Sequence, residues 1–115
     1  MPPPEWHLKF AQQMVDLADR ERNYKSPWVA CHAILRAFEE IIDAYGAQED
    51  LHFHDIYPNE AWLKRIGWIR SSKLDLLKDW NDLTSLCALI LTGQSGNVIS
   101  QMLDIVRNRL GMTIH

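Results

Sequence analysis

Apolar residues recur at every third or fourth position along most of the chain, which is the spacing of one face of an α-helix. The clearest stripe begins at Cys31 and ends at Tyr45, and another places Trp6, Phe10 and Met14 on one face of an earlier helix. No segment alternates apolar and polar residues as a half-buried strand does. The pattern predicts an all-α single domain (1–115), a helical bundle of four long helices and a shorter fifth. Helices are expected over residues 5–22, 27–45 and 97–110. Asn59 can cap a further helix that carries Trp62 and Ile69, and Ser71 or Ser72 can cap another that runs to Thr92.

Capping residues set the expected helix boundaries. Ser26-Pro27 fits an N-cap followed by a proline at the first helical position. Gly46 and Gly111 fit positions at which a helix stops, because glycine readily adopts the left-handed conformation of a C-cap. The pattern predicts a long loop over residues 47–58, and long ordered loops are often functional.

The interior is expected to form around the second and fourth predicted helices. Residues 83–91 are apolar nearly all round, as in a central buried helix. Both cysteines, Cys31 and Cys87, fall inside apolar helical patterns, so we predict two separate buried thiols in a reducing compartment and no disulfide. The residues that we expect in the core include Phe38, Ile41 and Leu83.

Composition narrows the class of protein. The chain has 115 residues and a net charge of −3, so it lacks the basic field that attracts nucleic acid, and we do not expect a nucleic-acid partner. No apolar run approaches the length of a membrane span, and the start Met1-Pro2-Pro3-Pro4 is unlike a signal peptide. Together with the two thiols, these features favour the cytoplasm and no contact with a membrane.

Two pairs of carboxylates lie on predicted helices. Glu40 and Asp43 are three residues apart on one helix, and Asp79 and Asp82 have the same spacing on a later one, so each pair neighbours within one turn. If the helices are adjacent, four carboxylates could hold Mg²⁺, which prefers oxygen ligands and could orient a triphosphate and an attacking water. The alternative is that these acids form solvated faces with basic neighbours on their own helices.

The two acidic segments, Glu40-Ile-Ile-Asp43 and Asp79-Trp-Asn-Asp82, resemble the E-x-x-E/D and E-x-x-D motifs of the all-α NTP pyrophosphatases of the MazG and dimeric dUTPase kind. As in that family, an apolar helix segment follows the second motif, while Asp replaces Glu at two motif positions. The resemblance implies a Mg²⁺-dependent nucleoside triphosphate pyrophosphatase whose metal ligands are Glu40, Asp43, Asp79 and Asp82.

Two segments that contain histidine suggest further chemistry. Arg109 and His115 are spaced as in the R-x4-6-H signature of HEPN domains, and residues 28–45 are similar to a core helix of that superfamily. This resemblance implies an RNA-binding or ribonuclease-derived domain, whereas the alternative is a basic helix end. His52, His54 and Asp55 are residue types that bind Zn²⁺, and the alternative is that they are solvated loop residues.

Aromatic and basic residues alternate on the third predicted helix. Such a mixture can stack nucleic-acid bases or form a protein interface. Helical spacing turns Trp68 away from the apolar side that carries Trp62, so we expect Trp68 to be exposed and to need a partner. The leading interpretation is a small helical protein-interaction module that acts as an adaptor or regulator, forms a homodimer and needs no cofactor. Its expected interface residues are Trp62, Trp68, Arg65 and Arg70.

Overall fold

The computed structural model describes residues 3–23, 27–53, 58–90, 92–93 and 96–113. These residues form five α-helices and contain no strand, which confirms the all-α prediction. The longest helix has 22 residues and the shortest, α3, has 15. The helices are α1 (Pro4–Asn23), α2 (Pro27–Gln48), α3 (Pro58–Ser72), α4 (Leu74–Ile90) and α5 (Gly96–Thr113).

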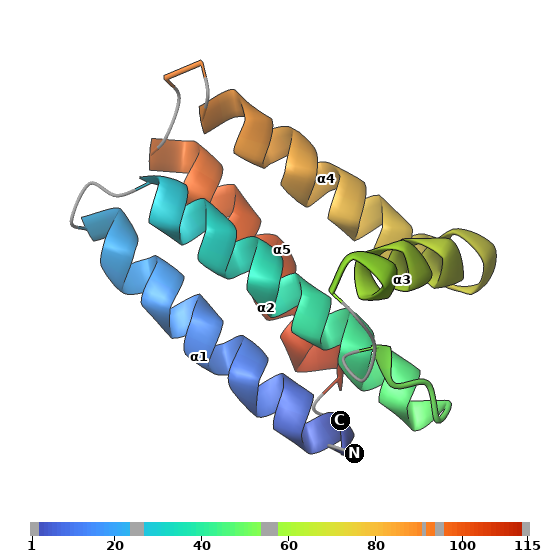
Figure 1. Cartoon of the computed structure of the whole chain (residues 1–115). Coiled ribbons are helices and arrows are strands. Elements are labelled where there is room, and N and C mark those ends of the chain that lie inside the picture. The colour runs from blue at the N-terminus through green and yellow to red at the C-terminus, as the bar shows by residue number, and fades with distance from the viewer. Residues whose placement is uncertain (1–2, 24–26, 54–57, 91, 94–95, 114–115) are drawn as a thin grey trace.

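Four of the helices run side by side as a bundle in which α2 and α5 lie between α1 and α4, and α3 lies across the end at which α4 begins (Figure 1). The core fills the space between them. Phe38, Ile41 and Leu83 are fully buried, as predicted, and the Phe38 ring lies 6.2 Å from the Trp80 ring of α4. Throughout the described ranges, no helix combines the length and the apolar character that a membrane crossing requires.

The buried face of α1 is shifted by one position along the sequence from the predicted one. The helix buries His7, Ala11, Val15 and Ala18, whereas Trp6 is exposed. Trp6 stacks instead on Phe10 along the outer side of the helix, with 5.8 Å between the ring centroids. Small alanine side chains let α1 pack closely on α2, and this packing decides which face is buried. The prediction followed the larger apolar residues and therefore missed His7.

Gly46 does not end α2, which continues to Gln48. A Cβ at position 46 would lie 2.7 Å from Cε2 of Phe53, so glycine is required here for the close approach of that ring. The chain leaves the helix at Asp50, which has a φ of 61°. Similarly, α5 runs through Gly111 to Thr113. The predicted N-cap Ser26 lies outside the described residues.

Helix α4 is an outer helix and not the central helix that its apolar second half predicts (Figure 1). It buries Leu76, Leu83 and Ile90, which are spaced by seven residues, and it leaves Leu89 exposed. The central position belongs to α2, whose alanines allow neighbours to approach closely on several sides. An apolar surface alone therefore did not determine which helix became central.

The two cysteines are joined in a disulfide, so the prediction of separate thiols is wrong. Cys31 on α2 and Cys87 on α4 have Cα atoms 5.9 Å apart, within the range of about 4.4–6.8 Å that a disulfide allows. Helical periodicity correctly places both residues on inner faces, but it cannot show that these faces oppose each other. The disulfide also removes the observation from which a reducing compartment was predicted.

Candidate functional site

A cluster of buried charged residues lies where α1, α2 and α3 meet. His7 on α1 and Glu40 on α2 are each 1% exposed, and Nδ1 of His7 lies 2.6 Å from Oε2 of Glu40. The second carboxylate oxygen of Glu40 accepts from the guanidinium of Arg36, one helical turn earlier. Burial of a charge is costly unless it is paired, and Glu40 is paired with His7 of α1 and with Arg36 of its own helix.

Arg65 connects α3 to this cluster. Its Nε donates to Oδ1 of Asp43 at 2.6 Å and its Nη2 donates to Oδ2 at 2.8 Å, which is a bidentate ion pair between α3 and α2. Asp43 is 1% exposed and Arg65 is 8% exposed. Burial disfavours the guanidinium charge, but the hydrogen bonds and charge of Asp43 outweigh it and raise the pKa of Arg65. The Arg65 guanidinium therefore keeps its charge, and its bidentate contact with Asp43 fixes α3 on the bundle.

Glu39 lies at the edge of the cluster, between two guanidinium groups. Its Oε2 is 3.5 Å from Nη1 of Arg36 and 3.6 Å from Nη1 of Arg65. Burial raises the pKa of Glu39, although both guanidinium groups act in the opposite direction. The neighbouring carboxylates of Asp43 and Glu40 raise it further. The surroundings of Glu39 thus favour its neutral form relative to an exposed glutamate, as the raised pKa indicates.

The cluster contains a possible set of metal ligands. One ligand atom from each of His7, Glu40 and Asp43 lies within 4.8 Å of the others, and nitrogen with two carboxylate oxygens is a donor set that Zn²⁺ accepts. Both carboxylates, however, are already bound by guanidinium groups, those of Arg36 and Arg65. These cations supply the positive charge that a metal would supply, so the geometry is better explained as an ion-pair network that joins three helices.

The four carboxylates predicted as Mg²⁺ ligands lie in two separate environments. Asp79 accepts from Nε and Nη2 of Arg109 on α5, at 2.9 and 2.6 Å, and Asp82 accepts from Lys78 at 2.9 Å. Within the described part of the chain, the single group of three or more potential ligand side chains is His7, Glu40 and Asp43. Asp79 and Asp82 therefore do not share a common point with Glu40 and Asp43.

The other histidine-bearing candidates are only partly within the described residues. Nη1 of Arg109 also donates to Asp75 at 3.1 Å, so its guanidinium faces the acidic side of α4. His115, its partner in the HEPN-like spacing, lies outside the described residues. Nε2 of His52 lies 3.0 Å from Oδ1 of Asp50. His54 and Asp55, which would complete the loop cluster, also lie outside the described residues.

The two tryptophans of α3 have exchanged their expected roles. Trp68 is half-buried, with its ring 5.6 Å from the Phe53 ring and Nζ of Lys73 5.7 Å from its centroid. Trp62 is 49% exposed. The prediction that Trp68 would be exposed is wrong, because the ring of Phe53, from the segment that follows α2, packs against it. Of the four expected interface residues, Trp62 and Arg70 lie at the surface, while Arg65 is buried against Asp43.

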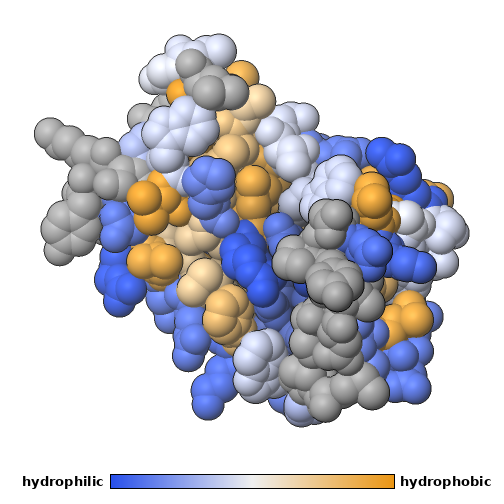
Figure 2. Space-filling model, in the orientation of Figure 1, coloured by the Kyte–Doolittle hydropathy of each residue, from blue (hydrophilic) through white to orange (hydrophobic). Residues whose placement is uncertain are grey.

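Exposed apolar side chains occur on every helix, so exposure alone does not identify a binding surface. Figure 2 shows apolar residues in a band from the top of the view to the left of its centre, with polar residues on both sides of this band. The large exposed apolar residues are Trp6, Trp28, Val29, Leu51, Trp62, Leu63, Leu74, Leu89 and Met112. A binding surface among them has to be identified from a second feature, such as a hollow.

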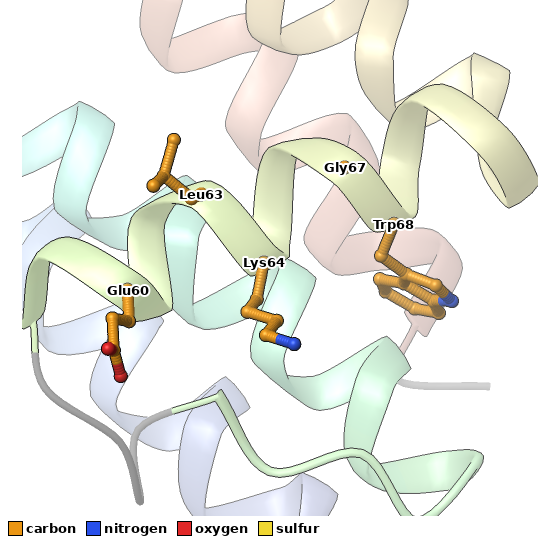
Figure 3. A pocket seen from close by; sticks show the side chains of 5 residues that line it. All are labelled: Glu60, Leu63, Lys64, Gly67 and Trp68. Carbon is orange, nitrogen blue, oxygen red and sulfur yellow. The ribbon is translucent and has the colours of Figure 1, made fainter.

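The outward face of α3, which we define as Glu60, Leu63, Gly67 and Arg70, has such a feature. A hollow of about 590 Å³ is lined by Glu60, Leu63, Lys64, Gly67 and Trp68. Figure 3 shows Gly67 in the middle of the helix, with Leu63 extending to one side and Lys64 and Trp68 to the other. A Cβ at Gly67 would meet nothing within 4 Å, so the hollow is open above the helix backbone.

No protein-family model, curated protein or solved structure matches this chain. Its function is therefore inferred from its own geometry. Two features distinguish that geometry: a buried ion pair that fixes α3 on the bundle, and an open hollow on the opposite face of the same helix.

Proposed function

We propose that this protein is a small helical protein-interaction module, acting as an adaptor or regulator, and that it binds a protein partner through the outward face of α3. The observation that carries the proposal is the pairing of a fixed inner face with an open outer face on one helix. Arg65 is bound to Asp43 on the inner side, while Leu63 is 63% exposed beside the hollow at Gly67.

The fixed inner face matters because α3 is short. An isolated helix of 15 residues is marginal in water, so α3 depends on its tertiary contacts. Arg65 and Ile69 are buried beneath it, and the bidentate geometry of Arg65 holds it in one orientation. A partner would therefore meet a helix that is already ordered, and binding would not have to order it.

Glycine in the middle of the exposed face also supports a binding role. Gly67 costs about 1 kcal/mol of helix stability relative to alanine. Among the residues that the structure describes, none requires a missing side chain at this position, because a Cβ would meet nothing within 4 Å. A glycine at this position allows the backbone of a partner, or one of its side chains, to approach the helix closely.

The interaction module fits the described geometry better than the two enzyme alternatives do. A Mg²⁺-dependent pyrophosphatase would use Asp79 together with Glu40, and these carboxylates are bound to two different arginines, Arg109 and Arg36. A HEPN-like ribonuclease would use Arg109 on phosphate, and its guanidinium already binds two carboxylates of α4.

The proposal can be tested by site-specific photo-crosslinking in cells that produce the protein. A benzophenone amino acid in place of Leu63 should form adducts with a protein, whether a different protein or another copy of this chain. The matched control is the same replacement at Met112 on α5, which is also 63% exposed. Adducts of equal yield from both positions, or none from position 63, would contradict a binding role for α3.

A further inference from the structure

We infer that the partner of α3 is a second copy of this chain, bound so that two α3 helices pack antiparallel with Leu63 of each copy over Gly67 of the other. This inference rests on the proposed function, because it uses the same face. It names the partner and fixes the register of the contact. The structural basis is a face that carries both a projecting side chain and the hollow to receive one (Figure 3).

The four residues of the outward face form one seam. Glu60, Leu63, Gly67 and Arg70 are spaced by three, four and three residues, which is the spacing of the contact positions in paired helices. All four are exposed. The opposite side of the helix holds Arg65 and Ile69, which are buried against the bundle. The seam therefore faces directly away from the body of the protein.

A twofold axis fits this seam at one position. In an antiparallel pair related by such an axis, residues equally far on either side of its centre face each other. Leu63 and Gly67 lie two residues on either side of position 65, and Glu60 and Arg70 lie five residues on either side of it. A single register therefore places Leu63 of one copy over the hollow at Gly67 of the other and brings Glu60 of one copy to Arg70 of the other. The twofold symmetry forms each of these two contacts twice in a dimer.

Charge favours this arrangement over its alternatives. The antiparallel register forms two Glu60–Arg70 pairs between copies, whereas a parallel pairing would place Glu60 beside Glu60 and Arg70 beside Arg70. Like charges across an interface are unfavourable, so the seam selects the antiparallel orientation. The glycine lets the two helix backbones approach closely at the crossing point, as small residues do in other helix pairs.

The contact is small, which predicts a weak and reversible dimer. Stable protein interfaces bury about 1,200–2,000 Å² in total, and two crossing helices as short as α3 bury less than that. We therefore expect association at high micromolar concentration and monomers at low concentration. Such a dimer can be measured by sedimentation equilibrium or light scattering over a concentration series.

The decisive experiment is a charge swap between copies. Glu60→Lys and Arg70→Glu should each weaken dimerisation on the order of tenfold, since each turns two attractive pairs into repulsive ones. An equimolar mixture of the two variants should restore association, because every introduced charge then meets its opposite. Glu5→Lys, at an exposed position of α1, is the control for the change in net charge and should leave dimerisation unchanged.

A second variant separates binding from folding. Gly67→Leu should raise thermal stability, because leucine is a better helix former and the site is open, yet it should abolish dimerisation by filling the hollow. A monomeric wild-type protein at all concentrations, or single charge variants that dimerise normally, or a mixture that fails to restore association, would overturn the inference. If position 63 then crosslinks to a different protein, the proposed function survives without it; if it crosslinks to none, both fail.

Discussion

The disulfide between Cys31 and Cys87 should contribute a large part of the stability of this domain. The two residues are 56 positions apart, and the bond joins α2 to α4 across the core. In the chain-entropy model, a cross-link that closes a loop of this length lowers the conformational entropy of the unfolded state. The free energy of the unfolded state therefore rises by about 4 kcal/mol relative to the folded state. The free energy of unfolding of small domains is only about 5–15 kcal/mol, so loss of the disulfide should leave the folded state only marginally stable.

The contribution can be measured by urea unfolding of the oxidised and reduced protein. Reduction is carried out on unfolded chains, because Cys31 is fully buried in the fold and a reductant reaches it poorly. The refolded, reduced protein should be less stable by about 4 kcal/mol, within the usual range of about 2–5 kcal/mol for small domains. Its helical circular dichroism spectrum should be unchanged below the transition, since the two thiols occupy nearly the same space.

The control is the double variant Cys31→Ala/Cys87→Ala, in which reductant should have no effect on the midpoint. Mass spectrometry after alkylation provides an independent check: without reductant, neither cysteine should react with iodoacetamide in the unfolded protein. If both cysteines are alkylated under these conditions, or if the oxidised and reduced proteins unfold at the same urea concentration, the disulfide and the calculation based on it are wrong.

Three further experiments, each by urea unfolding, test the core and the buried cluster. Arg65→Met leaves Asp43 as an unpaired buried charge and should cost about 3–5 kcal/mol, and adding Asp43→Leu should recover much of that loss; no recovery would contradict the ion-pair interpretation. Phe38→Ala opens a cavity beside Trp80 and should cost about 3–5 kcal/mol. Burial raises the pKa of Glu39, so its contribution to stability is present below its ordinary pKa and is lost as pH rises through the raised value. Glu39→Gln should therefore flatten this part of the pH–stability profile, which an unchanged profile would contradict.

The sequence alone predicted the helices and much of the core. Phe38, Ile41 and Leu83 are buried as expected, because each lies at the centre of a strong apolar stripe whose period is a local property of the chain. The glycine stop signals were less informative. Gly46 lies inside α2, and position 46 is a glycine because the ring of Phe53 occupies the space that a Cβ would fill. The neighbouring residues in the sequence do not indicate such a contact.

The candidate site depended on the tertiary structure more than the helices and the core did. The sequence contained Glu40 and Asp43 as a neighbouring pair, but it did not indicate that His7 and Arg65 would be their partners. A signal for His7 did exist, since it precedes Ala11 by one helical turn on the stripe of small residues that α1 buries. If the small apolar residues of α1 had been taken as its packing face in place of the large ones, His7 would have been predicted to be buried.

Local periodicity determined which residues share a face of each helix, since 3.6 residues per turn fixes their angles about the helix axis. It left open how the helices are ordered and rotated against each other. Tertiary packing made that choice, and with it placed Cys87 against Cys31, Arg109 against Asp79, and Arg65 against Asp43. Each of these pairs joins different helices across a gap of 22 or more residues, and such long-range contacts depend on the distances between helix axes, which the sequence pattern of a single helix does not contain.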